Sequence, residues 1–325
     1  MRLETLSLEV VKTSEIEGEI LNTEQVRSSV ARQLGIEHLY SNLVAPSREI
    51  DVIVEMMLKA SYDYDKPLTL DELFRWHKAL FPTGTSGLYN IKTGAFRDDS
   101  NGVMQVVSGG YGRTKVHFEA PKTERLPDEM VKFLAWYNDE DATLDLTIKA
   151  GLAHLWFVTL HPFDDGNGRL TRAITERMLA KSDDSKQRFY SMSAQILACR
   201  NEYYQILEHT QNGIASVNDW LIWFLSSLEN SLIKSLEMLQ KIMGQAKFWH
   251  AHHDTILNQR QILMINKLFG NFYGNLTSKK WASITKVSHD TALRDINDLI
   301  DKGILKKSEA SGRSQSYELV INEAS

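Results

Sequence analysis

The sequence predicts a mainly α-helical protein with one small β-hairpin in its middle and a compact C-terminal region of helices and strands. Three observations lead to this fold class. Apolar residues recur at three- and four-residue spacing in many segments, which is the pattern of helices with one buried face. The chain has six prolines and none follows Pro162, so long helices can continue uninterrupted. Glycines and short β-prone runs gather in one stretch, residues 89–117.

The helical elements follow one another along the first three quarters of the chain. Segment 22–34 is expected to end at Gly35, and segment 69–81 opens with an N-cap threonine and ends at Pro82. Segment 89–117 contains the runs MQVVS and TKVHF and is expected to form a long loop with an irregular hairpin. The remaining predicted helices are 47–62, 127–138, 146–160, 171–181, 193–211 and 217–243.

The C-terminal region differs in both pattern and charge. Three short helices are expected at 258–272, 278–284 and 288–302, followed by a glycine-containing β-hairpin. This order is the winged-helix layout. The whole chain has a net charge of −5, but residues 255–325 hold ten Lys and Arg against seven Asp and Glu. A basic region attached to an acidic body is typical of proteins with a nucleic-acid contact, although small differences of this kind are common.

Composition excludes several classes of protein. Apolar residues make up 42% and charged residues 24% of the chain, as in ordinary globular proteins. No run of about 18 apolar residues occurs, so no membrane span is expected. The first residues are partly acidic and contain no long apolar run, which argues against a secretory signal. Cys199 is the single cysteine, which fits a reducing compartment and a cytoplasmic location.

The stretch HPFDDGNGRLTR, residues 161–172, has the pattern of a phosphate site. An apolar helix delivers His161 to its C-terminal end, where Pro162 stops it. A tight loop with Gly166 and Gly168 lets backbone N–H groups approach a ligand, and a second helix then begins. A helix N-terminus favours phosphate through its free N–H groups and its dipole.

Charged side chains in the same stretch complete the pattern. Arg169 and Arg172 lie one helical turn apart and can bind a polyphosphate tail. Asp165 is the oxygen ligand that Mg²⁺ needs beside phosphates. His161 can accept the proton of an attacking hydroxyl near neutral pH. The GK[ST] ending of a Walker loop is missing.

These residues resemble the signature of the Fic family, HPFx[D/E]GN[G/K]RxxR, at every defined position. The resemblance implies a protein adenylyltransferase that uses ATP and Mg²⁺ to attach AMP to a Tyr, Thr or Ser hydroxyl of a protein, itself included. It implies His161 as the general base, Asp165 as the Mg²⁺ ligand and Phe163 as the core anchor of the loop. The residues that it assigns to the nucleotide phosphates are Asp164, Asp165, Gly166, Asn167, Gly168, Arg169 and Arg172.

Further stretches resemble other elements of the family. MQVVSGG resembles the hairpin flap that covers ATP and pairs with the backbone of the target, and it places Val106, Val107, Ser108 and Gly109 near the nucleotide. Tyr203 and Tyr204 match a tyrosine pair near the adenine, although an aromatic pair on a helix is as often core. Gln211, seven residues after Tyr204, matches a nucleotide-contacting amide.

The segment TSEIEG, residues 13–18, resembles the inhibitory pattern [S/T]xxxE[G/N] of class II Fic proteins. The resemblance implies that Glu17 pairs with Arg172 and occupies the place of the γ-phosphate. The implied domains are an N-terminal helical region with the inhibitory helix (1–65), a Fic catalytic core (66–245) and a winged helix-turn-helix domain (255–325).

Alternative functions stay open at this stage. The same site is compatible with AMP removal or with transfer of another nucleotide or phosphate-bearing group. A nucleotide-sensing DNA-binding regulator is the alternative from a different class. Its expected recognition helix, 288–302, carries Arg294 but also four aspartates, which disfavour phosphate contacts. The winged helix suits protein contact or dimerisation equally well, and a homodimer is among the open oligomeric states.

Overall fold

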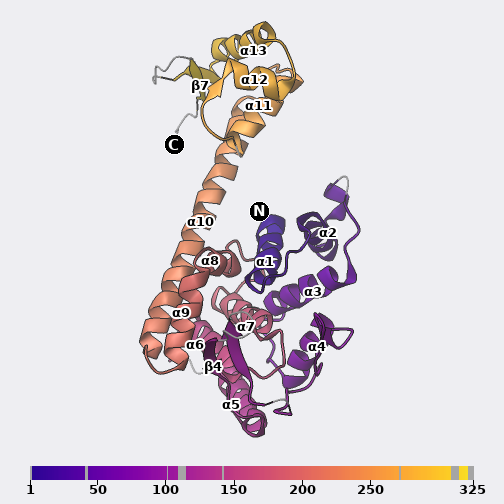
Figure 1. Cartoon of the computed structure of the whole chain (residues 1–325). Helices are drawn as coiled ribbons and strands as arrows, with labels where there is room; N and C mark the ends of the chain where they lie inside the picture. The colour runs from indigo at the N-terminus through magenta and orange to yellow at the C-terminus, as the bar shows by residue number, and fades with distance from the viewer. Residues whose placement is uncertain are drawn as a thin grey trace. The chain divides into compact units, whose positions relative to one another are not determined.

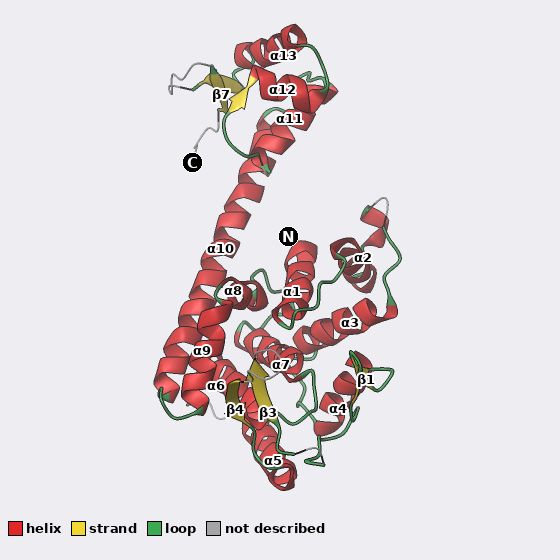
Figure 2. Cartoon of the chain, in the orientation of Figure 1, coloured by secondary structure: helices red, strands yellow, loops and turns green. Residues whose placement is uncertain are grey.

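The computed structural model describes residues 2–40, 43–100, 102–108, 115–140, 143–270, 272–308 and 315–320. The chain divides into two compact units, Met1–Ser235 and Leu236–Ser325, and the boundary falls within one long helix, α10 (Val217–Ala251). Figures 1 and 2 show that helices dominate both units and that the strands are few and short. The predicted mainly α-helical class is confirmed.

The N-terminal helices begin where short polar side chains cap them. The bounds are α1 (Arg2–Ile16), α2 (Thr23–Gln33), α3 (Arg48–Tyr62) and α4 (Leu70–Leu80). Asn22, Ser47 and Thr69 each accept a hydrogen bond from a backbone N–H of the first turn that follows. The helices predicted at 22–34, 47–62 and 69–81 therefore occur, the last with its expected threonine cap.

The core of the first unit is built around two adjacent helices, α6 (Leu146–Leu160) and α7 (Asn167–Ser182). Most residues of α7 are buried, and α5 (Leu126–Asn138) packs on α6. The prediction that this second helix spans 171–181 was wrong at its start, because Gly166 adopts a left-handed conformation (φ +77°) and forms the N-cap, so the helix begins four residues earlier, at Asn167. Gly168 consequently lies in the first turn of the helix and not in the loop.

The helix predicted over residues 193–211 is in fact two helices. α8 (Met192–Ala198) and α9 (Arg200–Gln211) are separated by Cys199, whose backbone angles (φ −117°, ψ 37°) are not helical. The buried carboxylate of Glu9, on α1, accepts a 3.1 Å hydrogen bond from the Ser193 N–H in the first turn of α8. This tertiary contact orients α8 separately, and periodicity cannot reveal a break of one residue. The helix predicted to end at residue 243 continues to Ala251.

The strands of the first unit lie in the glycine-bearing region. β1 (Thr85–Ser86) pairs with β2 (Tyr89–Asn90), and β3 (Gln105–Ser108) pairs antiparallel with β4 (Lys115–Glu119). The second pair is the irregular hairpin that the sequence predicts, with a register shift between Val106 and Val107. We call β3 and β4 the flap.

The second unit has its own core, centred on the buried side chains of Trp281, Ile296 and Leu299. Its elements are α11 (Gln259–Phe269), β5 (Leu276–Thr277), α12 (Ser278–Thr285), α13 (His289–Asp301), β6 (Leu305–Lys307) and β7 (Ser316–Leu319). The strands form one antiparallel sheet in the order β5-β7-β6. The order of helices and hairpin is the predicted one, and the winged-helix assignment stays a prediction. Asp295 on α13 is buried and pairs with Arg260 at 2.7 Å.

None of the helices in the described part of the chain is both long enough and apolar enough to cross a membrane.

Candidate active site

The turn after α6 holds His161 in an unusual backbone conformation. Its φ of 47° and ψ of 56° are left-handed, a region that non-glycine residues rarely occupy. Arg97 stabilises this turn: its Nε donates to the His161 carbonyl at 2.7 Å, and its backbone N–H donates to the Pro162 carbonyl at 3.0 Å. The Arg97 side chain is itself buried. The sequence analysis missed Arg97, and no short motif marks it.

The imidazole of His161 is oriented for proton acceptance. Its Nδ1 lies 3.2 Å from the Val158 carbonyl oxygen. Because a carbonyl oxygen only accepts, Nδ1 carries the proton and Nε2 keeps its lone pair. Desolvation lowers the pKa of His161 from its ordinary value. The ring is therefore neutral at pH 7, as a general base must be.

Buried contacts hold the loop between α6 and α7 in shape. The Asn167 side chain accepts from the Phe163 N–H at 3.0 Å and donates to the Phe163 carbonyl at 2.8 Å. The Phe163 ring stacks on His77 with centroids 4.2 Å apart. His77 Nε2 donates to the Asp165 carbonyl at 3.1 Å, and its Nδ1 accepts from the Gly94 N–H at 3.0 Å. Phe163, expected to anchor the loop in the core beside the nucleotide, and Asn167, expected at the phosphates, thus shape the loop with their side chains.

The N-terminus of α7 has the features of an anion site. Among the described residues, no side chain caps it, so the first-turn N–H groups remain available. A Cβ built on Gly168 would lie 2.0 Å from Glu17 Oε1. Glycine at this position leaves room for a carboxylate oxygen against the helix end, and a larger residue would require Glu17 to shift. A carboxylate therefore lies where the sequence analysis places the phosphates.

Glu17 and Thr13 together bind Arg172. Arg172 Nη2 donates to Glu17 Oε1 at 2.7 Å and to the Thr13 carbonyl at 2.7 Å, and its Nε donates to Thr13 Oγ1 at 2.6 Å. The guanidinium is 3% exposed, whereas the Glu17 side chain is 32% exposed. The predicted pair is thus present, and the threonine of the inhibitory pattern contributes a hydroxyl to the same arginine.

A second acidic residue of the same segment pairs with the other arginine. Both carboxylate oxygens of Glu19 accept from Arg169 Nη1, at 3.0 and 2.9 Å. The Arg169 side chain is 5% exposed and its guanidinium lies 5.0 Å from the centre of the Phe81 ring. The sequence analysis missed Glu19; its position two residues after Glu17 was the available signal.

The two aspartates of the loop contact the segment before the flap. Asp165 accepts a hydrogen bond from the Ser86 hydroxyl, and Asp164 Oδ2 accepts from the Lys92 N–H at 2.7 Å. The described part of the chain holds no group of three or more His, Cys, Asp or Glu side chains that could bind a metal alone. A single carboxylate beside an anion-binding helix end fits Mg²⁺ in combination with phosphate oxygens.

One cleft of about 740 Å³ brings together nine of the residues predicted for the site. Such a volume accommodates a nucleotide-sized ligand. Phe163, Asp164, Asp165, Gly166, Asn167, Arg169 and Arg172 do not line it, and Gly109 lies outside the described residues. The nine residues in its wall are Glu17, Val106, Val107, Ser108, His161, Gly168, Tyr203, Tyr204 and Gln211.

The two adjacent tyrosines of α9 have different environments. Tyr203 is buried, and its hydroxyl lies 2.9 Å from Nε2 of His154, a core histidine whose pKa burial lowers to about 3. Tyr204 is partly exposed and donates to the Ile16 carbonyl at 3.3 Å, at the end of α1. Gln211 Nε2 donates to Thr159 Oγ1 at 3.2 Å. Tyr203 is therefore chiefly a core residue, whereas Tyr204 joins the cleft to the segment that carries Glu17.

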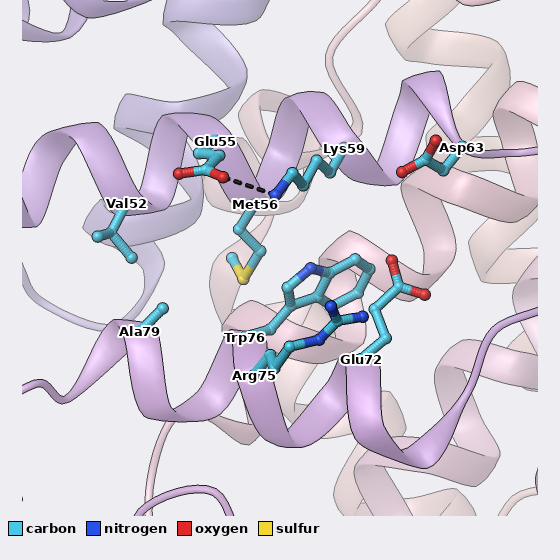
Figure 3. A pocket seen from close by; sticks show the side chains of 9 residues that line it. All are labelled: Val52, Glu55, Met56, Lys59, Asp63, Glu72, Arg75, Trp76 and Ala79. Carbon is cyan, nitrogen blue, oxygen red and sulfur yellow. Dashed lines mark ion pairs between the residues drawn. The ribbon is translucent and has the colours of Figure 1, made fainter.

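A second hollow of about 260 Å³ lies between α3 and α4 and is lined by Trp76, Met56 and the Glu55–Lys59 ion pair (Figure 3). None of the predicted site residues is among those that line it. The candidate site is accordingly the cleft at the flap.

Comparison with known proteins agrees with this geometry. Residues 67–179, which include the flap, His161 and α7 to Leu179, match the model of the Fic/DOC family. The chain contains a Fic domain. Residues 1–36, with α1 and the segment that carries Glu17 and Glu19, match a separate domain of unknown function, DUF4172.

Curated relatives of the Fic domain carry two kinds of transferase name. A protein adenylyltransferase fic-1 from Caenorhabditis elegans is 26% identical over 194 residues, covering 56% of this chain and 33% of that protein. A uridine 5'-monophosphate transferase from Xanthomonas campestris pv. campestris (strain 8004) is 31% identical over 125 residues, covering 35% of this chain and 21% of that protein. The chain thus spans a third or less of the length of these two relatives.

Solved structures share the fold. A Fic family protein from Desulfovibrio desulfuricans G20 superposes with a TM-score of 0.54 at 19% identity, covering 100% of this chain and 88% of that one. A Fic domain containing signaling protein from Bacteroides thetaiotaomicron VPI-5482 gives 0.53 at 20% identity, covering 72% of this chain and 86% of that one. At these identities the likeness concerns the fold alone.

Proposed function

We propose that this protein transfers AMP from ATP to a Tyr, Thr or Ser hydroxyl of a protein, and that Glu17 inhibits the reaction. One observation carries the proposal. The carboxylate of Glu17 lies on Arg172 and against Gly168 at the uncapped end of α7, in the same cleft as His161. An anion-binding helix end beside a neutral histidine is suited to phosphoryl-group chemistry.

In the proposed reaction, His161 Nε2 takes the proton of the target hydroxyl. The hydroxyl oxygen then forms a bond to the α-phosphorus, the bond from that phosphorus to the bridging oxygen breaks, and pyrophosphate leaves. The N–H groups at the start of α7 and the guanidinium groups of Arg169 and Arg172 stabilise the charge that builds up on the phosphate oxygens. In this proposal, the protein binds and orients the nucleotide phosphates, and it deprotonates the target hydroxyl.

Mg²⁺, bound by Asp165 and the phosphate oxygens, would neutralise part of the phosphate charge. Ser86, which hydrogen-bonds to the Asp165 carboxylate, would orient it for this role.

Inhibition in this proposal is competition for the same positive groups. With Glu17 on Arg172, the triphosphate loses a guanidinium contact and meets a negative charge at the end of α7. One relative is named for AMP transfer and another for UMP transfer, so the nucleobase of the substrate is less closely defined than the phosphate chemistry. The test therefore includes both ATP and UTP.

The test compares four proteins: wild type, Glu17→Gly, His161→Ala and the Glu17→Gly/His161→Ala double variant. Each is incubated with Mg²⁺ and α-labelled ATP or UTP, alone and with a cell extract, and label on protein is quantified. We expect weak labelling of wild type, strong labelling of Glu17→Gly from ATP, and none without His161.

Each other outcome has a definite meaning. Labelling from UTP alone would replace AMP by UMP in the proposal. Absence of label from both nucleotides in Glu17→Gly would contradict a nucleotidyltransferase. Equal labelling of wild type and Glu17→Gly would retain the transferase and exclude inhibition by Glu17.

A further inference from the structure

The second strand of the flap contains one residue without a partner in the ladder. Val106 pairs with Phe118 and Val107 pairs with Val116, so His117 between them is the extra residue of a β-bulge. A bulge bends the strand and redirects the side chain of its extra residue, and bulges are frequent beside active sites. The contacts of His117 therefore indicate what this bulge achieves.

His117 makes contacts to α9 and to the first flap strand. Its Nδ1 lies 2.5 Å from Glu208 Oε2, on α9, and its Nε2 lies 2.5 Å from Ser108 Oγ, on β3. Its carbonyl oxygen accepts from Asn212 Nδ2 at 2.8 Å at the end of α9. The bulged residue is thus bonded through its side chain and through its backbone.

Glu208 is the centre of this cluster. Its second carboxylate oxygen accepts from Lys115 Nζ at 2.9 Å, so one carboxylate contacts two residues of β4. These bonds keep the pKa of Glu208 below its ordinary value, and the carboxylate is charged at neutral pH. Lys115 is largely exposed and its pair contributes little, whereas His117 and Glu208 are both about a quarter exposed.

We propose that His117 and Glu208 act as a clasp that positions the flap over the cleft. The clasp joins the strands expected to align the target with α9, the helix that carries Tyr204 and Gln211 on the nucleotide side. Both clasp residues and Ser108 line the same cleft as His161, and Figure 1 shows β4 beside α9. This inference rests on the proposed transfer reaction, for which His117 and Glu208 are positioning residues.

The clasp predicts a specific effect on transfer. Misplacing a reactant by about 1 Å can reduce a rate by about 100-fold. In the Glu17→Gly background, we expect His117→Ala and Glu208→Ala to lower the initial labelling rate by about 10- to 100-fold. We expect binding of a fluorescent ATP analogue with Mg²⁺ to change by less than about threefold, because the α7 end and its arginines are untouched.

Matched variants separate positioning from simple damage. Asn has an amide N–H close to where the imidazole holds Nδ1, so His117→Asn is expected to recover part of the rate that His117→Ala loses. Lys132→Ala removes an exposed pair with Glu129 on α5 and should leave the rate unchanged. Hydrogen exchange of the intact proteins reports the flap directly: β4 amides should exchange faster in both alanine variants, and α7 amides should not.

The outcomes distinguish the clasp from the transfer reaction. Unchanged exchange of β4 in both alanine variants would overturn the clasp whatever the activity. Faster exchange with an unchanged labelling rate would leave a structural contact and overturn the positioning role. An equal loss of analogue binding would also overturn it. If the Glu17→Gly parent labels nothing from ATP or UTP, the proposed function fails first, and the positioning role fails with it.

Discussion

The loop at the start of α7 and the segment Thr13–Glu19 lie against each other, yet they are held in different ways. The loop is fixed by contacts among buried groups, such as the Asn167 amide on both backbone groups of Phe163 and Arg97 on the His161 carbonyl. In the segment, buried Thr13 accepts two hydrogen bonds from Arg172, whereas the carboxylates of Glu17 and Glu19 are 32% and 45% exposed, on arginines that are 3% and 5% exposed. The arginines thus belong to the permanent site, whereas the carboxylates are already partly hydrated and can move into solvent.

This difference has a consequence for regulation. A carboxylate that water can reach loses little when it exchanges its partner for solvent. A buried guanidinium without a partner is costly, and phosphate oxygens would replace the carboxylates as partners. Four predictions test whether substitutions in the loop affect catalysis and stability, and whether substitutions in the segment relieve inhibition.

The largest effect is expected at His161. In the Glu17→Gly background, His161→Ala should lower the labelling rate by about 100- to 10,000-fold, the range for a lost general base. His250→Ala, an exposed histidine of α10, should leave the rate unchanged. Thermal melting of both variants checks that they are folded. Residual activity within tenfold of the parent would place the base elsewhere.

The next effect separates the two acidic residues. Glu17→Gly should raise labelling by about 5- to 150-fold, the range of typical coupling energies between two ligands of one protein. Glu19→Ala should raise it by only about two- to fivefold, because its ion pair with Arg169 is more exposed. Initial rates of labelling measured side by side decide the order. A larger effect of Glu19→Ala would make Arg169 the principal point of inhibition.

The third prediction concerns stability. Asn167→Ala should lower the free energy of unfolding by about 1–3 kcal/mol, because the buried N–H and carbonyl of Phe163 both lose their partner. Asn218→Ala, at an exposed position of α10, is the matched control and should change it by less than about 0.5 kcal/mol. Urea unfolding of the full chain measures both. A larger loss of stability in Glu17→Gly than in Asn167→Ala would reverse the comparison.

The smallest expected effect is a shift of a pH profile. Desolvation lowers the pKa of His161, so the imidazole is half protonated only at a pH below the ordinary value of about 6.5. The midpoint of the acid limb in the pH profile of Glu17→Gly should therefore lie below pH 6.5. The negative charge of Glu17 raises this pKa, so its removal shifts the decline further towards acid. An acid limb at or above pH 6.5 would contradict a desolvated base.

The fold was largely predictable from the sequence because its signals are local. Caps at Asn22, Ser47 and Thr69 begin helices through hydrogen bonds within three residues, and a sequence contains that information. The break at Cys199 and the early start of α7 were missed. The first accompanies the contact of Glu9 with α8, and the second depends on a left-handed Gly166.

The candidate site likewise has residues that local sequence signals mark and residues that only tertiary contacts bring in. The motif at 161–172 and Glu17 were predictable because family patterns are matched by residue types at fixed spacing in the sequence. Arg97 and the His117–Glu208 pair could not, because no motif marks them and each acts on a group that lies 64 or 91 residues away in the sequence. The sequence alone predicted which residues would carry the chemistry, since residue types at a fixed spacing set the local backbone. Only the tertiary structure decided which side chains hold or cover them, because burial and hydrogen-bond distance exist only once distant segments have packed together.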